Sequence, residues 1–425
     1  MRSNSPTNRA DCVQSLCNPA FTPWETMTID ERVARWRSET PGCAHRIHLN
    51  NAGAGLMPRP VIDAIDEHIA LESEIGGYEA ADAREPAIES VYSDIATLIN
   101  AEPHNVAIVA NATAGFIQSV SSFDFERGDI IVTTRSDYTS YQIQYLSLSR
   151  RLGVEILHAE DLPEGGVDPE SVRRLAANPR CKLVHVSWIP THSGLVQDAE
   201  GVGVVCEELG VPYLVDACQA VGQLPVDVHR LRCDYLSVTA RKFLRGPRGI
   251  GFLFASDRAL ARGDYPLFVD MRGAQWTGTN EFAVADSAMR YEDWEFPYAL
   301  VLGLGAAVRY AIGVGIDVAQ ERAWALAAEL RERLAALDDV RVLDRGSRRS
   351  AIVTAEFQDI DAKKLSDLLR NRRINSAASL RWFGLIDFSA RDVGSALRLS
   401  PHYYNTHEEI LTATAAIAEI VRGMR

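Results

Sequence analysis

The chain lacks the features that mark disulfide-bonded, zinc-binding, secreted or membrane proteins. It has seven cysteines among 425 residues, an odd number, and no two stand at Cys-x-x-Cys spacing, so neither a disulfide framework nor a zinc site is indicated. No apolar run approaches the length of a membrane span. The first residues, Met1-Arg-Ser-Asn-Ser-Pro, lack the apolar core of a secretory signal. These absences predict a reduced, soluble protein of the cytoplasm.

Basic charge is also scarce. Lys and Arg number 44 against 57 Asp and Glu, which gives a net charge of −13. So acidic a chain is a poor candidate for sequence-independent binding of nucleic acid, and an anionic ligand must be held by local groups. Hydrophobic residues make up 47% of the chain, enough for a large core.

Short apolar segments alternate with helical patterns from about residue 88 to 255. The predicted strands are Val106–Val109, Ile130–Thr133, Val154–His158, Leu183–Ser187, Tyr213–Val215, Tyr235–Val238 and Gly251–Phe254. Even alternation predicts an α/β fold with a mostly parallel seven-stranded sheet flanked by helices. No Gly-x-Gly-x-x-Gly follows the first strand, which argues against a nicotinamide-binding sheet.

Three parts are expected along the chain. Residues 1–45 form an N-terminal extension and helix, residues 46–300 a large ligand-binding domain, and residues 301–425 a small α+β domain. The tail up to about residue 25 is expected to be poorly ordered, and the capping-box-like pattern at Thr28 predicts the helix that follows. Further helices are expected from Pro60 to Glu74, near Tyr298–Gly313 and from Thr406, with strands near Val340–Val342 and Ser350–Glu356.

Two charged residues follow buried strands, at the sheet edge where open α/β folds bind ligands. Asp216 ends the run Val211-Pro-Tyr-Leu-Val-Asp; it is either an ordinary helix N-cap or the partner of a protonated pyridine nitrogen. Lys242 ends Ser237-Val-Thr-Ala-Arg-Lys and enters a glycine-rich turn. A lone lysine is usually a surface residue, but burial can lower its pKa enough to form an imine. The combination indicates a pyridoxal phosphate (PLP) enzyme, with Lys242 carrying the cofactor as a Schiff base.

Other residues at the same edge suit the rest of such a cofactor. Asn111-Ala-Thr-Ala-Gly opens a predicted helix, which makes it an anion site or, equally, a plain N-cap at Thr113. Thr239 and Arg241 could complete a phosphate cup. Tyr138 could stack on a flat ring, although alone it is better explained as a loop tyrosine packed at the surface.

Together these residues resemble the class V aminotransferase-like, fold-type I PLP enzymes, the group of cysteine desulfurases and their relatives. The resemblance covers almost the whole chain after about residue 45. The stretches Arg241-Lys-Phe-Leu-Arg-Gly-Pro-Arg-Gly-Ile-Gly and Ile189-Pro-Thr-His-Ser-Gly-Leu look more like the C–S lyase branch, which includes hercynylcysteine sulfoxide lyase and enzymes of lincosamide pathways. The resemblance to this family implies a homodimer with the active site at the subunit interface.

The resemblance also implies a role for each matched residue. Lys242 would be the Schiff-base lysine, Asp216 the pyridinium partner, and Gln219 a donor to the phenolic oxygen of PLP. Tyr138 would stack on the ring, Thr191 would lie near the ring oxygen, and Ala112, Thr113, Thr239 and Arg241 would hold the phosphate. Arg398 would pair with the α-carboxylate of an amino-acid substrate, with a structural surface arginine as the alternative. Trp276 would line the active site of the partner subunit or, equally, be an interface or core tryptophan.

Two departures from the desulfurase pattern matter. Desulfurases carry a persulfide-forming cysteine on a loop of the small domain, whereas here the last cysteine is Cys233 and residues 374–398 contain none. Desulfurases also have Gly-Thr after an Arg-aromatic-Glu run, and this chain has Arg290-Tyr-Glu-Asp-Trp-Glu instead. The first departure disfavours a nucleophilic desulfurase mechanism. The second leaves the contact with the phosphate site of the partner subunit in doubt.

The predicted function is a PLP-dependent lyase that cleaves the C–S bond of an S-substituted L-cysteine. The products would be a thiol or sulfenate, pyruvate and ammonia, in specialised sulfur or antibiotic metabolism. The alternative is an oxygen-using decarboxylation and deamination of an S-cysteinyl conjugate to an aldehyde. Epimerase, aminotransferase and cysteine desulfurase activities are weaker alternatives. A catalytically inactive PLP fold is disfavoured because Lys242 and Asp216 are both present.

Overall fold

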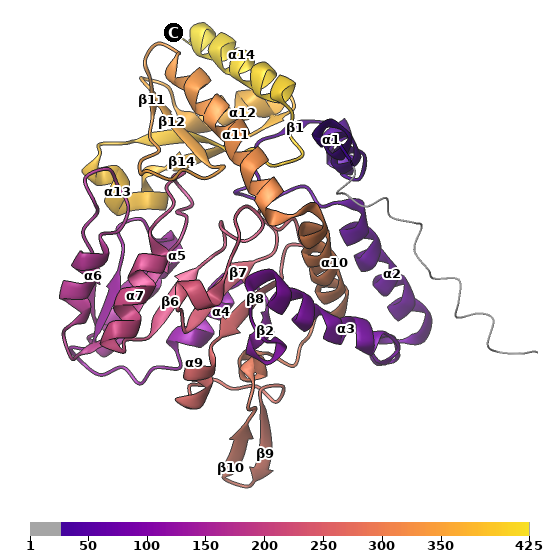
Figure 1. Cartoon of the computed structure of the whole chain (residues 1–425), viewed down its shortest axis with the longest axis vertical. Helices are drawn as coiled ribbons and strands as arrows, with labels where there is room; N and C mark the ends of the chain where they lie inside the picture. Colours follow the sequence, from indigo (N-terminus) through magenta and orange to yellow (C-terminus); the bar gives the residue numbers. More distant parts are fainter. Residues whose placement is uncertain (1–26, 425) are drawn as a thin grey trace, which may run out of the picture.

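The computed structural model describes residues 27–424 and contains the predicted seven-stranded sheet, with a smaller four-stranded sheet beside it (Figure 1). The strands lie in the order β2 (Val106–Val109), β8 (Gly251–Ala255), β7 (Tyr235–Thr239), β6 (Tyr213–Asp216), β5 (Cys181–Ser187), β3 (Ile130–Thr133) and β4 (Glu155–His158). Only β8 runs antiparallel to its neighbours. The predicted fold is confirmed, and the strand ends differ from the expected ones by at most two residues.

Both faces of this sheet are buried. Neighbouring residues of one strand enter different hydrophobic clusters: Ile131 packs in one and Val132 in the other. Strands buried on both faces are apolar throughout, which is why they could be recognised in the sequence. The helices that connect and flank these strands are α4 (Ala112–Val120), α5 (Thr139–Leu152), α6 (Pro169–Ala176), α7 (Ala199–Leu209), α8 (Val228–Leu231) and α9 (Asp257–Ala261).

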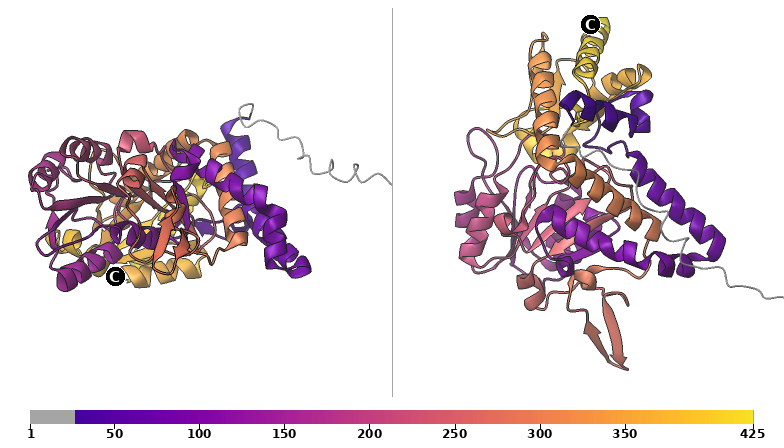
Figure 2. Two further views of the ribbon diagram at one scale, coloured as in Figure 1. Left: turned by 90° about the horizontal axis from the view of Figure 1, so that it is seen from below. Right: turned by 45° about the vertical axis from the view of Figure 1, so that its right-hand side comes forward.

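Three long helices pack together on one side of the large sheet (Figure 2). They are α2 (Arg59–Ile75), α3 (Gly77–Ile99) and α10 (Tyr298–Val314). Two glycines permit the close packing of α10, because a Cβ at Gly303 would lie 2.7 Å from Ile65 and one at Gly305 would lie 2.7 Å from Val91. The sequence did not predict α3, whose Gly77 and internal Pro86 are residues that normally interrupt helices.

The second sheet is antiparallel throughout. Its strands lie in the order β11 (Val340–Val342), β12 (Val353–Phe357), β15 (Ser395–Leu399) and β14 (Ala377–Leu380). The remaining helices are α1 (Ile29–Ser38), α11 (Ile316–Ala335), α12 (Ala362–Asn371), α13 (Leu385–Ala390) and α14 (His407–Met424), with 3-10 turns at Pro41–Ala44, Pro103–Asn105, Ala288–Tyr291 and Arg381–Gly384. The predicted capping box of α1 is present at Thr28 and Glu31. The predicted strand from Ser350 begins instead at Val353.

The N-terminal part of the described chain joins the C-terminal part. Strand β1 (Ile47–His48) pairs in parallel with β13 (Ile374–Asn375). The expected domain boundaries at residues 46 and 301 stay predictions, and the expected tail lies outside the described residues. Within residues 27–424, no single helix is long and apolar enough to cross a membrane, and only α10 and α11 together, bent by 79°, pass that test.

A hairpin that the sequence did not predict projects from the large sheet (Figure 1). It consists of β9 (Ala274–Gly278) and β10 (Glu281–Val284). Trp276 pairs with Phe282 across the hairpin and is 79% exposed.

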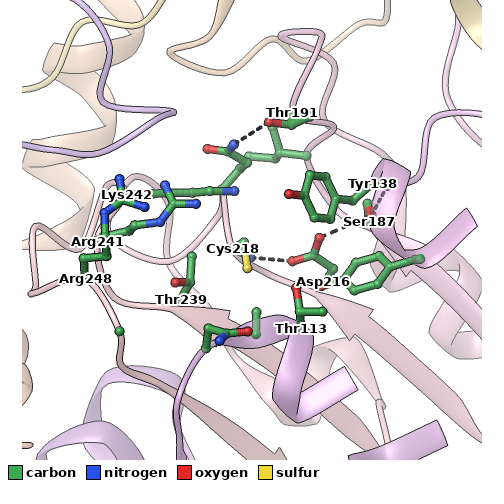
Figure 3. Close-up of a pocket in the computed structure, with 16 residues that line it drawn as sticks. Thr113, Tyr138, Ser187, Thr191, Asp216, Cys218, Thr239, Arg241, Lys242 and Arg248 are labelled. Atoms are coloured by element: carbon green, nitrogen blue, oxygen red, sulfur yellow. Dashed lines mark hydrogen bonds between the residues drawn. The ribbon is translucent and has the colours of Figure 1, made fainter. Parts of the chain in front are cut away.

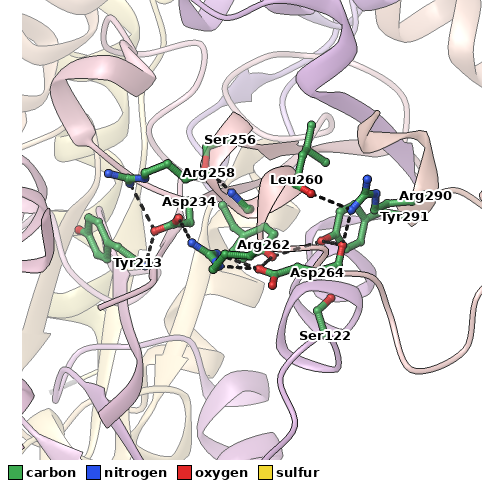
Figure 4. Close-up of polar contacts among 12 residues, drawn as sticks. Ser122, Tyr213, Asp234, Ser256, Arg258, Leu260, Arg262, Asp264, Arg290 and Tyr291 are labelled. Carbon is green, nitrogen blue, oxygen red and sulfur yellow. Dashed lines mark hydrogen bonds and ion pairs between the residues drawn. The ribbon is translucent and has the colours of Figure 1, made fainter. Parts of the chain in front are cut away.

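A polar network fixes the end of the sheet that lies away from the ligand edge (Figure 4). Asp234, just before β7, accepts hydrogen bonds from the backbone N–H of Tyr213 at 2.9 Å and from Arg262 Nη1 at 2.7 Å. The backbone N–H of Ser256, just after β8, donates to the carbonyl oxygen of Asp234 at 2.8 Å. Three strands are therefore joined at one end, and the opposite ends of β6 and β7 come into register with Asp216 opposite Ser237.

A buried ion pair links the two sheets. Arg331 Nε lies 2.8 Å from Asp344 Oδ2, and Arg331 Nη2 donates to the carbonyl oxygens of Ser350 and Ile352. The backbone N–H of Gly194, in the loop after β5, donates to Asp344 at 2.9 Å.

We expect Arg331→Met to lower the free energy of unfolding by about 3–5 kcal/mol, because it leaves the buried Asp344 without its cation. Arg333→Met on the same helix is the matched control. Its exposed pair with Glu329 should contribute less than about 1 kcal/mol. Urea denaturation measures both; equal losses in the two variants would contradict the assignment.

Candidate functional site

A cavity of about 250 Å³ lies at the carboxyl ends of β6 and β7 (Figure 3). It brings together nine of the residues predicted for the site: Ala112, Thr113, Tyr138, Thr191, Asp216, Gln219, Thr239, Arg241 and Lys242. A second cavity of about 230 Å³ shares Tyr138, Thr191, Arg241 and Lys242 with the first and adds the predicted Arg398. Trp276 lines neither cavity.

Lys242 is 8% exposed, whereas the other three lysines of the chain, Lys182, Lys363 and Lys364, are exposed. Within residues 27–424 its amine forms no hydrogen bond or ion pair, and Nζ lies 6.0 Å from the centre of the Tyr138 ring. Burial lowers the pKa of Lys242, because a low-dielectric surrounding disfavours the ammonium form. The amine is therefore more nucleophilic at neutral pH than that of an exposed lysine.

The turn that carries Lys242 is anchored by Arg245, which the sequence analysis missed. Arg245 is buried and adopts a φ of 62°. Its guanidinium donates to the carbonyl oxygen of Leu56 at 2.7 Å, to the hydroxyl of Tyr403 at 2.6 Å and to the hydroxyl of Thr40 at 2.6 Å. Three separate segments thus hold the turn, and with it the backbone of Lys242.

Asp216 faces the cavity and is 7% exposed. Its Oδ1 accepts a hydrogen bond from the backbone N–H of Cys218 at 2.9 Å, and its Oδ2 accepts one from Ser187 Oγ at 3.3 Å. No cation lies within ion-pair distance among the described residues. The alternative of a helix N-cap is wrong, because β6 leads into a turn and not into a helix. A buried carboxylate without a cation favours a cationic ligand.

Ser187 connects the two groups that would contact a planar ligand. Its hydroxyl donates to Asp216 and accepts from the backbone N–H of Tyr138 at 3.3 Å. Its own N–H donates to Asp137 Oδ1 at 2.9 Å. The sequence analysis missed Ser187, although it ends a predicted strand directly opposite Asp216 in the sheet.

Beneath Ser187, a buried ion pair fixes the loop that carries Tyr138. Asp137 Oδ2 lies 2.9 Å from His185 Nδ1, and Thr133 and Thr134 donate to the same carboxylate. Burial opposes ionisation of Asp137, but His185 and these donors hold its pKa below the ordinary value. The carboxylate is therefore charged, and it accepts the N–H of Ser187 as an anion.

The N-terminus of helix α4 forms one end of the cavity. Asn111 caps the helix by accepting from the N–H of Ala114 at 3.0 Å, so the N-cap alternative at Thr113 is wrong. The hydroxyls of Thr113 and Thr239 line the cavity and have no hydrogen-bond partner among the described side chains and backbone. A helix N-terminus with free hydroxyl donors is suited to an anion.

Two arginines add positive charge at this end. Arg241 donates to the carbonyl oxygen of Gly53, and burial, followed by the proximity of Arg248, lowers its pKa. Arg248, which the sequence analysis did not select, lines the same cavity. Neither has an acidic partner within residues 27–424. Two neighbouring cations without an acid favour a ligand with more than one negative charge.

Thr191 lies between Gln219 and Arg398. Gln219 Nε2 donates to Thr191 Oγ1 at 3.2 Å, and Arg398 Nη1 donates to the carbonyl oxygen of Thr191 at 2.8 Å. Gln219 Oε1 and Arg398 Nε are buried without partners. Burial lowers the pKa of Arg398 to about 10, so it is a cation at neutral pH. Asn50 Oδ1 accepts from Arg398 Nη2 at 3.3 Å. Because no carboxylate of residues 27–424 pairs with this guanidinium, it can bind one from a ligand.

This donor set fits PLP. An unpartnered buried amine, a carboxylate without a cation, an aromatic ring and an anion site at a helix N-terminus are the four contacts that the cofactor needs. Gln219 lines the same cavity, where its Nε2 donates to the carbonyl oxygen of Ala52 at 3.1 Å and to Thr191 Oγ1 at 3.2 Å.

The family and the relatives of the chain agree with this geometry. Residues 47–412 match the aminotransferase class-V family. A probable cysteine desulfurase of Methanothermobacter thermautotrophicus is 24% identical over 390 residues, which cover 90% of this chain and 97% of that protein. A probable cysteine desulfurase of Xylella fastidiosa is 26% identical over 430 residues and covers 96% of this chain and 97% of its own.

Two solved structures have the same fold. The apo cysteine desulfurase from Thermococcus onnurineus NA1 superposes with a TM-score of 0.85 at 23% identity, covering 94% of this chain and 99% of that one. The cystine C–S lyase C-DES, in complex with its reaction product cysteine persulfide, superposes with a TM-score of 0.78 at 22% identity, covering 89% and 99%. Because the family match spans most of its length, the chain belongs to the class V aminotransferases, a family of PLP enzymes.

Proposed function

We propose that this protein is a PLP-dependent lyase that cleaves the C–S bond of an S-substituted L-cysteine, releasing a thiol or sulfenate together with pyruvate and ammonia. The observation that carries the proposal is a single joined site with Lys242, Asp216 and Arg398 and no thiol able to accept sulfur. The names of the relatives, cysteine desulfurases and a cystine C–S lyase, support cleavage of a C–S bond in a cysteine-type substrate. A homodimer, a cytoplasmic location and a place in sulfur or antibiotic metabolism are part of the proposal.

Each residue of the site has a task that follows from its position. Arg398, held by Thr191 and Asn50, binds the α-carboxylate of the substrate. Lys242 Nζ removes the α-proton, a task that suits an amine whose pKa is lowered by burial. Bound PLP supplies an electron sink for the negative charge that develops at the α-carbon.

Asp216 keeps the pyridine nitrogen protonated, and Tyr138 covers one face of the ring. The N-terminus of α4 holds the phosphate with Thr113, Thr239 and the two arginines that line the cavity.

The cysteines argue against a persulfide mechanism. Cys218 is the only cysteine among the residues that line either cavity. Burial, followed by the charge of Asp216, raises the pKa of its thiol far above the ordinary value, so the thiol is protonated and a poor nucleophile. Sulfur therefore leaves on the substituent of the substrate and is not transferred to the protein.

Two stretches support the C–S lyase branch of the family. Residues 241–251 form the turn after Lys242, and residues 189–195 form the loop that holds Thr191. Both stretches thus lie around the cavities, where a resemblance within a family reflects chemistry more than folding.

Product analysis by mass spectrometry tests the proposal. PLP-loaded protein with S-methyl-L-cysteine, a cysteine sulfoxide and a bulky S-conjugate should yield pyruvate with a free thiol or sulfenate. Lys242→Ala should reduce turnover by at least about 10³-fold, because it removes the base and the covalent anchor. Lys182→Ala, which changes an exposed lysine, should leave turnover unchanged.

Borohydride reduction and peptide mapping give an activity-independent check, and should locate the cofactor on Lys242. An S-linked aldehyde with loss of carbon dioxide would replace the lyase by the oxidative decarboxylation. Full turnover in Lys242→Ala would end both proposals.

Ser187→Ala should weaken PLP binding about tenfold, because it removes one donor to Asp216 and one acceptor for the N–H of Tyr138. Titration of the apo protein with PLP, followed by visible circular dichroism, measures the affinity. Ser171→Ala is the matched control: this buried serine accepts one hydrogen bond from Glu160 and lines neither cavity. If both variants bind PLP like the parent protein, Ser187 does not position the site.

A further inference from the structure

One wall of the second cavity differs in composition from the lining of the first cavity. It opens from the first cavity at Lys242 and extends toward the smaller sheet. The residues that line only this second cavity are Ala52, Gly53, Ala377, Ala378, Ser379, Phe383 and Arg398. Apart from Arg398, none of these residues carries a charge, and Phe383 is the largest of the uncharged ones. The cations Arg241 and Lys242 line the part that the second cavity shares with the first.

The wall lies beside the group that would hold the substrate carboxylate. Ala377 pairs directly with Arg398 between the antiparallel strands β14 and β15. A ligand with its carboxylate on Arg398 and its α-carbon near Lys242 can therefore place its side chain along β14. The small side chains of β14 and the ring of Phe383 line the cavity there.

Two segments that follow strands of the large sheet hold Phe383 in place. Thr139 Oγ1, one residue after Tyr138, donates to the carbonyl oxygen of Phe383 at 2.7 Å. The next residue, Gly384, packs so closely on His192 that a Cβ there would lie 2.6 Å from the imidazole. His192 follows Thr191. The segment is thus fixed to both loops that carry the site. The ring of Phe383 lies tilted by 35° against that of Trp382, with centroids 4.0 Å apart.

We propose that Ala377, Ser379 and Phe383 form the subsite for the sulfur substituent and select a neutral, apolar group, an aromatic one best. The inference rests on the proposed function and specifies its substrate class. These three side chains offer no partner to a charged substituent, and burying an unpaired charge is costly. An aromatic substituent gains a ring contact with Phe383. Cysteine itself would leave the subsite unfilled.

Kinetics with three substrates test the selectivity. kcat/KM for S-benzyl-L-cysteine should exceed that for S-methyl- and S-carboxymethyl-L-cysteine by about tenfold or more. Phe383→Ala should lower the value for the benzyl substrate about tenfold and change that for the methyl substrate less than about twofold. Ser379→Leu, on the same face of β14 as Ala377, should exclude the benzyl substrate and retain the methyl one. Leu385→Ala, which changes an exposed side chain outside both cavities, is the matched control and should alter neither.

Calorimetry with 3-(benzylthio)propanoate gives a readout that needs no turnover. This compound keeps the carboxylate and the thioether but lacks the amine. Its Kd for the PLP-loaded protein should rise about tenfold in Phe383→Ala and stay unchanged in Leu385→Ala.

These experiments distinguish a failure of the proposed lyase function from a failure of the subsite assignment. If no S-substituted cysteine reacts, the proposed function is wrong, and binding of 3-(benzylthio)propanoate alone decides the subsite. If S-methyl-L-cysteine reacts but the benzyl substrate is no better, or if Phe383→Ala affects all substrates equally, the subsite assignment is wrong and the lyase stands.

Discussion

Lys242 and Asp216, an amine and a carboxylate, are buried in one cavity, and no ion pair joins them in the described part of the chain. If they met, each would satisfy the other, and the site would lose both its free amine and its free carboxylate. Arg245 holds the turn of Lys242 through three segments. Ser187 and the N–H of Cys218 hold the two oxygens of Asp216. Burying both groups without partners is costly. A bound cofactor that contacts the amine at one point and the carboxylate at another offsets that cost.

The same constraint explains why the site needs both sheets. The cofactor-binding residues lie on the large sheet, but Arg398 lies on β15 of the smaller one. The distance between them depends on how the sheets are joined. Arg331 and Asp344 join them through Gly194, where an added Cβ would lie 2.2 Å from the carbonyl oxygen of Ile352. Packing away from the cavity thereby sets the place where a substrate carboxylate meets the amine.

Much of this arrangement could be predicted from the sequence, and the reasons are physical. Most strands of the large sheet are buried on both faces and are therefore largely apolar, although β4 is partly exposed and β5 contains Lys182 and His185. Lys242 stands out because it follows a buried strand. The scarcity of lysine, four in the whole chain, was a further signal that the sequence analysis left unused. In contrast, α3 contains Gly77 and Pro86, and the hairpin of β9 and β10 is largely exposed. Helix α3 is stabilised by packing on α2 and α10, which overrides its helix-breaking residues. The hairpin buries neither face, so its sequence has no apolar alternation that would predict strands.

The residues that were missed at the site share one property: their role depends on contacts across the fold. In the sequence Arg245 cannot be distinguished from an ordinary loop arginine. Its role is visible only in the folded chain, where Thr40 and Tyr403 lie beside it. Ser187 is one polar residue at a strand end, and only the register with β6 brings it to Asp216. Sequence patterns identify groups that do chemistry because those residue types are unusual at their positions. They do not identify the groups that hold them.

The segment from β14 to α13 shows how such holding contacts can redirect a family's chemistry. In this region the resemblance to desulfurases calls for a reactive cysteine, which must approach the substrate sulfur to accept it. In this region the chain has Phe383, whose carbonyl oxygen accepts from Thr139 and whose ring lies against that of Trp382. An aromatic ring cannot accept sulfur, but it can contact a group attached to sulfur. Under the proposed function, bond cleavage would therefore rest on Lys242, and the smaller sheet would recognise the group on sulfur.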